Sequence, residues 1–282
     1  MKSVVVTGAS TGIGWGCVKV LIAGGFRVFG GVRRESDADR LIKEFGANFT
    51  PLIFDVTEPA AVAAAAGKVR AALGGETLFG LVNNAGIAVP GPLLELSIDD
   101  FRRQIDVNLI GQLIVTQAFA PLIGVDGSQR GPPGRIVMIS SVGGKTAFPF
   151  AGAYAASKFG LEGLSEALRR ELMMFSVDVI VVAPGNVATP IWDKSVAAGD
   201  GQFANSPYAP SLARMKRYAL ETGKKGLAPE RIGESVKTAL TTARPRTRYT
   251  LAPDPITTLI TRRFPKRIVD KLIASQLGLK KA

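Results

Sequence analysis

The first twenty-three residues constrain the possible fold more than any other part of the chain. Residues 3–7 have the continuous apolar character of a buried strand, and they run directly into the glycine-rich segment Thr7–Gly14. The apolar spacing of Gly12–Ala23 then predicts a helix. A strand, a glycine turn and a helix in this order are typical of a dinucleotide-binding α/β fold, because the helix N-terminus offers unpaired N–H groups to a diphosphate.

The glycines of this turn each have a separate physical reason. Gly8 permits the tight turn, Gly12 lets a diphosphate approach the backbone, and Gly14 lets the helix pack closely on the sheet. A purely structural turn is the alternative, and the strand–turn–helix context disfavours it. We therefore predict that the turn contacts the cofactor through Gly8, Ser10, Thr11, Gly12, Ile13 and Gly14.

Short runs of β-branched residues alternate with helical patterns along the chain. Two long helices are predicted at Ile98–Leu122 and Ala153–Phe175. Continuous apolar strands between helices indicate an α/β fold with a doubly wound parallel sheet, the Rossmann fold. The predicted strands are Ser3–Thr7, Arg27–Gly31, Asn48–Ile53, Leu78–Asn83, Arg135–Ser140, Asp178–Ala183 and one near Tyr249–Ala252.

The 282 residues are enough for one large domain, and no linker divides them. We expect a Rossmann-fold domain over residues 1–255 and a basic amphipathic C-terminal tail over residues 256–282. Residues 190–227 are the least regular part and are predicted to form a substrate-binding loop or lid, with simple packing on the domain as the alternative. The large side chains scattered through this part are Trp192, Phe203, Tyr208, Met215 and Tyr218.

The end of the second predicted strand bears on the choice of cofactor. A site that prefers NAD usually has an acidic residue there, which binds the ribose hydroxyls. This chain has Arg33 and Arg34 instead, and guanidinium groups suit a ribose phosphate. The sequence therefore predicts NADP(H). In the alternative, both arginines are ordinary surface charges and Glu35 or Asp37 binds the ribose, but these acids lie far downstream.

Tyr154 and Lys158 lie four residues apart in a predicted helix, so their side chains share one face. An ammonium about 5 Å from a phenol favours the phenolate by roughly 3 kcal/mol at an effective dielectric constant of about 20, or about two pKa units. We therefore expect Lys158 to lower the pKa of Tyr154 toward the range useful for acid–base catalysis. The spacing alone is common in helices. Its value comes from Ser141, which follows a strand at the sheet edge where such folds bind ligands.

Taken together, these motifs resemble the short-chain dehydrogenase/reductase family over about residues 3–190. Residues 28–33, 160–172 and 246–253 look similar to the steroid- and retinoid-type branch of that family. The family motifs are matched by the glycine turn Thr7–Gly14, by Asn-Asn-Ala-Gly at residues 83–86, by Asn108, Ser141, Tyr154 and Lys158, and by Pro184–Thr189.

The resemblance implies hydride transfer between a nicotinamide and a carbonyl or alcohol. Tyr154 would exchange a proton with the substrate oxygen, and Ser141 would hydrogen-bond the same oxygen. Lys158 would bind the nicotinamide ribose and lower the pKa of Tyr154, while Asn108 would hold a water that links Lys158 to solvent. The remaining implied cofactor contacts are Asp55 and Val56 at the adenine, Asn84 and Ala85 at the ribose, Val187 and Thr189 at the nicotinamide amide, and in addition Gly86, Pro184 and Gly185.

The expected function is therefore NADP(H)-dependent interconversion of a carbonyl and an alcohol, on a lipophilic steroid-, retinoid- or aldehyde-like substrate. A non-catalytic NADP(H)-binding sensor or scaffold is the alternative, although such proteins typically lose the Tyr or the Lys. The family implies a homodimer or homotetramer, formed through the two long helices.

Charge and composition limit the other partners. The net charge is +12, and ten Lys or Arg against two Asp lie in the last forty residues, so that a solvated face or peripheral membrane contact through the tail is expected. No nucleic-acid motif accompanies these charges. No metal site is expected from a chain with no His and one Cys. The single Cys and the absence of a recognisable signal peptide predict a cytoplasmic protein, with membrane-peripheral placement as a variant.

Overall fold

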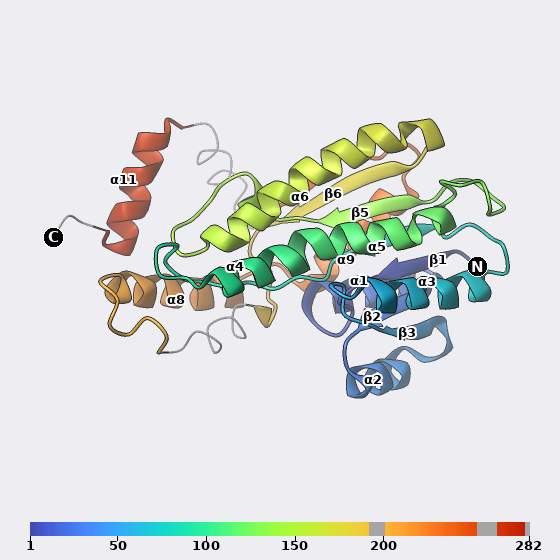
Figure 1. The fold of residues 1–282 in the computed structure, drawn as a ribbon, viewed down its shortest axis with the longest axis horizontal. Coiled ribbons are helices and arrows are strands. Elements are labelled where there is room, and N and C mark those ends of the chain that lie inside the picture. Colours follow the sequence, from blue (N-terminus) through green and yellow to red (C-terminus); the bar gives the residue numbers. More distant parts are fainter. Residues whose placement is uncertain (192–200, 253–263, 280–282) are drawn as a thin grey trace.

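The centre of the molecule is a seven-stranded parallel sheet in the order β3-β2-β1-β4-β5-β6-β7 (Figure 1). The computed structural model describes residues 1–191, 201–252 and 264–279. The reversal of strand order beside β1 confirms the predicted doubly wound Rossmann fold. The strands are β1 (Ser3–Val6), β2 (Arg27–Val32), β3 (Phe49–Ile53), β4 (Gly80–Asn83), β5 (Arg135–Ile139), β6 (Asp178–Pro184) and β7 (Arg248–Leu251).

The strand ends differ from the predicted ones by one or two residues, as is usual at element boundaries. The largest shift is at the start of β4, which was predicted at Leu78 and begins at Gly80. Leu78 is fully buried, which explains its apolar character. Its backbone N–H, however, donates to the carbonyl of Leu122 at 2.7 Å and does not join the ladder.

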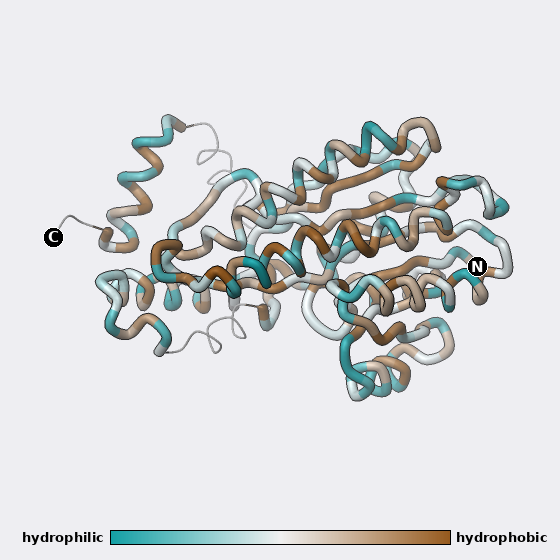
Figure 2. The backbone as a smooth tube through the Cα atoms, viewed as in Figure 1, coloured by the Kyte–Doolittle hydropathy of each residue, from teal (hydrophilic) through white to brown (hydrophobic). Residues whose placement is uncertain are grey.

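Helices cover both faces of the sheet, as the continuous apolar strands predict. Alternate residues of one strand serve different faces: Val5 packs with one set of helices, and Val4 and Val6 pack with the other. The first face is covered by α3 (Pro59–Leu73), α5 (Gly111–Phe119) and α6 (Gly152–Glu171). The second is covered by α1 (Gly12–Ala23), α2 (Glu35–Phe45) and α9 (Pro229–Thr241). Figure 2 shows the most hydrophobic backbone in the strands between these layers.

The predicted helix Ile98–Leu122 consists of four segments in one continuous run. α4 (Ile98–Ile105) begins at Ser97, whose hydroxyl accepts the Asp100 N–H at 3.0 Å, as expected of a helix cap. A π-helical segment (Asp106–Ile110) links α4 to α5, and a 3-10 turn (Ala120–Ile123) ends the run. Within the described residues, this run is also the one stretch apolar and long enough to cross a membrane by composition, but its inner face packs against the sheet.

Two further helices lie at the carboxyl end of the sheet. α8 (Ala209–Lys224) and α11 (Lys266–Leu277) contact each other there (Figure 1). The second predicted long helix is present as α6 followed by a 3-10 turn (Leu172–Phe175). Short 3-10 turns also occupy Gly46–Asn48 and Val142–Gly144. Residues 192–200 of the predicted lid and residues 256–263 and 280–282 of the predicted tail lie outside the described residues.

Candidate active site

A cavity of about 1470 Å³ opens at the carboxyl ends of the central strands. This is where a doubly wound sheet binds ligands. Every predicted catalytic and cofactor-binding residue lines it, with the exceptions of Gly14 and Arg34. The sequence motifs, which are spread over nearly 190 residues, are therefore brought to one place by the sheet topology.

The glycine turn forms one wall of the cavity. Gly8 and Gly12 have φ values of +65° and +58°, which other residues rarely adopt. A side chain on Gly8 would also lie 2.9 Å from the Cα atom of Ala85. Gly14 does not face the cavity: a Cβ atom there would lie 2.1 Å from the Gly8 carbonyl oxygen, so Gly14 permits packing of α1 on the turn. This bare backbone at a helix N-terminus fits the diphosphate of a dinucleotide.

Asn84 holds the glycine turn in shape. Its Nδ2 donates to the carbonyls of Thr7 and Gly8 at 2.8 and 3.2 Å. In return, the Thr7 hydroxyl accepts the N–H groups of Asn84 and Ala85, both at 2.9 Å. Asn84 lines the cavity as predicted, but the amide group of its side chain is directed to the turn.

The two arginines after β2 have different surroundings. Arg33 lines the cavity, is largely exposed and lies 3.8 Å from the carboxylate of Asp55. Arg34 does not line it; it precedes the first residue of α2 and donates from Nε to Asp37 at 2.9 Å. The side chain of Arg34 is thus directed toward Asp37 at the start of α2, and its predicted contact with the cofactor stays a prediction.

Arg40 is a basic residue near the glycine turn that the sequence prediction missed. Its Nη2 donates to the Ser10 carbonyl at 2.6 Å, and the same guanidinium lies 3.4 Å from Asp37. Arg40 lies on the same helix as Asp37, one turn further along, so the helical spacing was the available signal.

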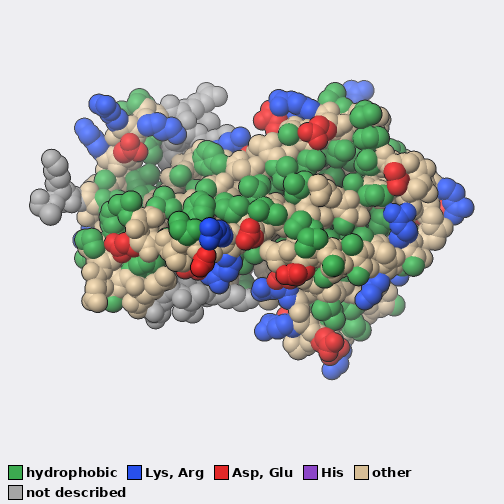
Figure 3. Space-filling model, in the orientation of Figure 1, with side chains coloured by type: hydrophobic (Ala, Val, Ile, Leu, Met, Phe, Trp, Pro, Cys, Tyr) green, Lys and Arg blue, Asp and Glu red, His purple; other side chains and the backbone are tan. Residues whose placement is uncertain are grey.

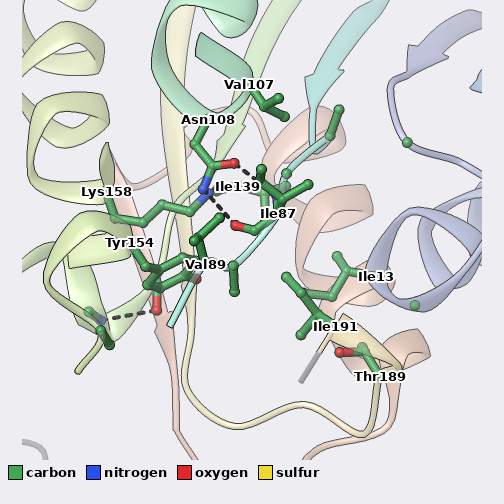
Figure 4. Close-up of a pocket in the computed structure, with 18 of the residues that line it drawn as sticks. Ile13, Ile87, Val89, Val107, Asn108, Ile139, Tyr154, Lys158, Thr189 and Ile191 are labelled. Atoms are coloured by element: carbon green, nitrogen blue, oxygen red, sulfur yellow. Dashed lines mark hydrogen bonds between the residues drawn. The ribbon is translucent and has the colours of Figure 1, made fainter. Parts of the chain in front are cut away.

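Tyr154 and Lys158 project from the first turns of α6 into the cavity (Figure 4). Lys158 Nζ lies 5.9 Å from the centre of the Tyr154 ring and donates to the Ile139 carbonyl at 2.9 Å. Ser141 follows β5, and its hydroxyl hydrogen-bonds the Tyr154 phenol. The same hydroxyl accepts the Gly143 N–H at 3.0 Å. The predicted trio thus meets at one point of the cavity wall.

Burial shifts the pKa values of the two titratable residues of this trio, Tyr154 and Lys158. It raises the pKa of Tyr154 above its ordinary value, and the hydrogen bond from Ser141 opposes this only in part. Burial lowers the pKa of Lys158 to about 8, and the charge of Glu162 opposes that shift. In this arrangement the net shift of the Tyr154 pKa is upward, and the expectation that Lys158 lowers it stays a prediction.

Asn108 lies in the π-helical segment and is fully buried. Its Oδ1 accepts the Ile87 N–H at 2.8 Å, and its Nδ2 donates to the Ile87 carbonyl at 3.0 Å and to the Ser157 hydroxyl at 3.2 Å. The side chain is therefore used to fix the cavity wall beside Lys158 (Figure 4). The water-mediated link from Asn108 to Lys158 stays a prediction.

Three neighbours of Asn108 on the same helix bind the same extended segment, residues 83–89. Gln104 accepts the Val89 N–H at 2.8 Å and donates to the Ile87 carbonyl at 3.0 Å. Gln112 donates to the Ala85 carbonyl at 2.5 Å, and Thr116 accepts from the Asn83 side chain at 2.8 Å. We call this set the amide ladder: Gln104, Asn108, Gln112 and Thr116. All four side chains are buried, and the predictions from sequence included only Asn108.

The remaining predicted contacts are distributed along the cavity. Asp55 accepts from the N–H and the hydroxyl of Thr57 at 3.0 and 2.8 Å, which orders the turn after β3. Thr189 lines the cavity directly beside the glycine turn, since a Cβ on Gly12 would lie 3.1 Å from its side chain. The cavity lining also includes the predicted contacts Val56, Ala85, Gly86, Pro184, Gly185 and Val187.

The end of the cavity beyond Tyr154 is mostly apolar. Met215 and Tyr218 line it from α8, and Ile273 and Leu277 line it from α11. Phe203 and Tyr208 pack on the domain instead: Phe203 lies against Gly91, and the Tyr208 ring is 5.8 Å from that of Phe150. Trp192 lies outside the described residues.

A smaller cavity of about 600 Å³ adjoins this apolar end. The two cavities share Phe148, Pro149 and Ile273 in their walls, and Asp270 is the only charged residue that lines the smaller one among the described residues. No group of three or more His, Cys, Asp or Glu side chains able to hold a metal ion occurs in the described ranges.

Residues 2–200 match the family model described as short chain dehydrogenase. The chain is 33% identical over 278 residues to the NADPH-dependent 3-dehydrocapnine reductase of Ornithobacterium rhinotracheale, and the match covers 98% of each chain. It is 32% identical over 267 residues to retinol dehydrogenase 16 of Mus musculus, covering 90% of this chain and 81% of the relative.

Among solved structures, the fold is similar to the closed form of serine dehydrogenase complexed with NADP+. The TM-score is 0.74 and the sequence identity 27%, and the match covers 90% of this chain and 95% of the other.

Proposed function

Because the chain belongs to the short-chain dehydrogenase family, it is an oxidoreductase, and we propose that it interconverts a carbonyl compound and an alcohol with NADP(H). The observation that carries the proposal is the meeting of Tyr154, Ser141 and Lys158 at the wall of a cavity that also contains the glycine turn. The steroid- and retinoid-type branch is supported by the similarity to retinol dehydrogenase 16.

The assignment of NADP(H) rests on two independent grounds. Arg33 is a largely exposed cation at the end of β2, where the phosphate of an NADP ribose lies in this fold. A relative matched over almost the whole chain is named as NADPH-dependent, and the similar serine dehydrogenase is complexed with NADP+. Asp55, the carboxylate beside Arg33, keeps the guanidinium at the cavity rim.

In the proposed reaction, the bound cofactor supplies or accepts the hydride, and the protein supplies geometry and the proton. In the direction of reduction, Tyr154 donates its phenolic proton to the substrate oxygen, while Ser141 hydrogen-bonds the same oxygen and orients it. Burial raises the pKa of the Tyr154 phenol and so makes it a weaker acid, which means that the proton transfer depends on groups that stabilise the phenolate. The same two groups act in reverse during oxidation.

Lys158 supports Tyr154 in this proposal. With a pKa of about 8, it is an ammonium at neutral pH, although it is buried. Its charge stabilises the phenolate that remains after the proton has left. Its ammonium protons not used by the Ile139 carbonyl are available to the nicotinamide ribose.

We propose a lipophilic ketone or aldehyde as the substrate. The apolar residues Met215, Tyr218, Ile273 and Leu277 favour an aliphatic or ring-system substituent at the far end of the cavity. The adjoining smaller cavity behind Phe148 and Ile273 gives room for a chain that extends away from the reacting carbon. The relative named as a 3-dehydrocapnine reductase supports reduction as the main direction.

We also propose a homo-oligomer in the cytoplasm. Ile98, Ile110 and Phe159 are exposed apolar side chains on α4, the π segment and α6, and such surfaces favour association of copies. Peripheral membrane contact is proposed through α11, whose basic residues Lys266, Arg267 and Lys271 suit an anionic surface.

The test of the proposed reaction uses Tyr154→Phe and a panel of lipophilic ketones and aldehydes with NADPH. The wild type should oxidise NADPH, and the variant should lose at least 100-fold in kcat with little change in the Kd for NADPH, because general acid catalysis typically contributes 10²–10⁴-fold. Binding of NADPH without turnover in the wild type would favour the non-catalytic sensor and contradict the enzyme. Equal turnover in both proteins would contradict the role of Tyr154.

A further inference from the structure

One buried carboxylate at the active site has no part in the reaction described so far. Glu162 lies on α6 one turn beyond Lys158, so Tyr154, Lys158 and Glu162 follow one another on the same helix face. It is 7% exposed. Buried carboxylates need several hydrogen-bond or ionic partners, because an isolated buried charge is strongly unfavourable.

Glu162 has such partners on three other parts of the chain. Its Oε1 accepts from the Ser140 hydroxyl at 2.7 Å and from Arg248 Nη2 at 3.1 Å. Its Oε2 accepts from Arg248 Nε at 3.2 Å and lies 3.6 Å from Lys145 Nζ. One side chain of α6 thus joins the end of β5, the 3-10 turn that follows it and the edge strand β7.

These contacts bear directly on the position of Ser141. Ser140 precedes Ser141 in the chain, and Arg248 Nη2 approaches the Ser141 carbonyl at 3.5 Å. The turn is also closely packed: a Cβ on Gly144 would lie 2.9 Å from the Ser140 hydroxyl and 3.0 Å from Glu162 Cγ. Glu162 therefore holds residues 140–144, which we call the serine turn, against α6, the helix that carries Tyr154.

Among the described residues, Glu162 is also the charged group whose attraction raises the pKa of Lys158 against the effect of burial. Tyr154 and Glu162 are the titratable groups of α6 beside this ammonium, while Lys145 and Arg248 lie on the Glu162 carboxylate, at 3.6 and 3.1 Å. From β5, Lys158 meets the neutral Ile139 carbonyl. Glu162 thus opposes the effect of burial on Lys158, and the two cations on its carboxylate partly offset its charge.

We propose that Glu162 is a positioning residue of the proton-transfer site, which fixes the Ser140–Ser141 turn relative to Tyr154 and keeps Lys158 in its ammonium form. This inference rests on the proposed function, because the ammonium matters only if Lys158 supports Tyr154 and binds the cofactor ribose. Loss of the Glu162 charge should make Lys158 release its proton at a lower pH.

The test compares Glu162→Gln with Glu166→Gln. The amide of Glu162→Gln keeps an oxygen that accepts from Ser140 and Arg248, but it carries no charge. Glu166 is the matched control: it lies on the same helix, one turn further on, exposed and paired with Arg170. In Glu162→Gln, the pH above which kcat/KM for ketone reduction declines should fall by about one unit, the size expected for a charge one helical turn away. Glu166→Gln should keep the wild-type profile, and an unmoved decline in Glu162→Gln overturns the proposal.

A second variant separates electrostatics from mere structural support. Arg248→Gln removes the cation that pairs with Glu162, so the Glu162 charge acts on Lys158 with less compensation and the decline should move to higher pH, opposite to the Glu162→Gln shift. If both variants only lower activity at every pH, Glu162 has a purely structural role and the proposal is wrong. Arg248→Gln also provides the test should Glu162→Gln fail to fold, as judged by its circular dichroism and Tm.

The pH dependence of NADPH binding keeps this inference separate from the proposed reaction. The Kd for NADPH, followed by its fluorescence, should begin to rise at a lower pH in Glu162→Gln than in the wild type. An absence of turnover in the wild type would contradict the proposed function, whereas the binding comparison would still decide the role of Glu162. The same Kd profile in both proteins overturns it.

Discussion

At the scale of single residues, burial and charge oppose each other in the proposed active site. Lys158 is an ammonium in an interior position, 5% exposed, and its pKa is lowered to about 8 mainly by desolvation. Such a shift from the ordinary value of 10.5 means that the folded state disfavours the charged form by on the order of 3 kcal/mol. The buried ammonium of Lys158 therefore lowers the free energy of unfolding of the protein.

Lys158→Met should stabilise the protein at neutral pH. In the wild type, the proton on Lys158 opposes folding below pH 8, and this effect disappears as the pH rises through 8 toward 10.5, where the folded and unfolded states are both neutral. We expect the variant to gain about 1–2 kcal/mol at pH 7, less than the full shift because the Ile139 carbonyl loses its donor. The gain should disappear as the pH rises toward 10.5 and become a small loss there, because the neutral amine of the wild type still donates to the Ile139 carbonyl.

Urea denaturation of both proteins between pH 6 and 10.5 measures this difference. Lys145→Met is the matched control, because Lys145 is about two-fifths exposed and avoids most of the cost of desolvation. A difference between wild type and Lys158→Met that stays constant across the pH range would contradict the lowered pKa.

The two arginines after β2 should differ in their effect on cofactor use. Arg33→Ala should raise the KM for NADPH about tenfold or more and leave the KM for NADH nearly unchanged, because Arg33 faces the cavity. Arg34→Ala should alter neither constant, since Arg34 pairs with Asp37. Steady-state kinetics with both cofactors measures the effect. Equal losses of NADPH use in the two variants would indicate that Arg34 binds the cofactor as well.

The comparison of these residues shows what a sequence can reveal about a site. Motif residues such as Tyr154 and Ser141 were found because their spacing and their place after a strand are local properties. The direction of the Tyr154 pKa could not be predicted, because it depends on burial by parts of the chain distant in sequence. The position of Glu162 could have been predicted, since it continues the helix face of Lys158. Its partners Ser140 and Arg248 could not, because they come from other elements.

At the scale of elements, the apolar end of the cavity is built by two helices that approach from outside the sheet. α8 and α11 contact each other and contribute Met215, Tyr218, Ile273 and Leu277 to the wall. Figure 1 shows both helices beyond the strand ends, on the side away from the N-terminus of the chain. Substrate selection should therefore respond to changes in α11 more than to changes in the sheet.

Ile273→Ser should raise the KM for a lipophilic ketone several-fold with little change in the KM for NADPH. The side chain lines both cavities, and its loss exposes a substrate chain to a polar wall. Leu272→Ser is the control, because the adjacent side chain is 62% exposed and absent from both cavity walls. If the two variants had equal kinetics, α11 would have no part in substrate binding.

Elements were predicted with unequal success, and the reasons are physical. Strands buried on both faces have continuous apolar runs, so all seven were found within one or two residues. The π segment inside the run Ile98–Ile123 was not predicted. It aligns the helix side chains with their hydrogen-bond partners in segment 83–89, which lies elsewhere in the chain and is not visible in the helix sequence itself. The packing of α11 on α8 depends on contacts across long sequence separations, which periodicity does not reveal.

At the scale of the whole molecule, charge is distributed unevenly. The net charge is +12, and Figure 3 shows Lys and Arg side chains clustered over α11. Ile268 and Leu272 are exposed on the same helix, beside Arg267 and Lys271. Basic and apolar side chains on one exposed helix are the features that favour an anionic lipid surface.

Sedimentation with vesicles tests this proposed membrane contact. The protein should co-sediment with vesicles that contain phosphatidylserine, less so with neutral phosphatidylcholine vesicles, and binding should weaken as the salt concentration rises. The triple variant Lys266→Glu, Arg267→Glu and Lys271→Glu should reduce binding at least tenfold. Unchanged binding in the variant would show that the α11 surface is only solvated.

The amide ladder joins two chain segments with different repeats. Its side chains recur at every fourth helical residue, from Gln104 to Thr116, whereas the facing groups recur at every second residue of segment 83–89. In an ideal α-helix, three such steps would rotate the last side chain by about 120° relative to the first. A π segment absorbs one extra residue, so the rotation over the same span falls to about 20°.

The two segments also advance at nearly equal rates, about 6 Å per four helical residues and about 6.6 Å per two extended ones. The π segment therefore compensates for the difference between the helical repeat and the extended repeat, so that all four ladder side chains face their partners in segment 83–89. Removal of a single residue between Asn108 and Gln112 would therefore convert the π segment into an ordinary α-helical turn and leave the four ladder side chains in phase with the cavity wall, whereas insertion of one more residue would rotate Gln112 and Thr116 away from it.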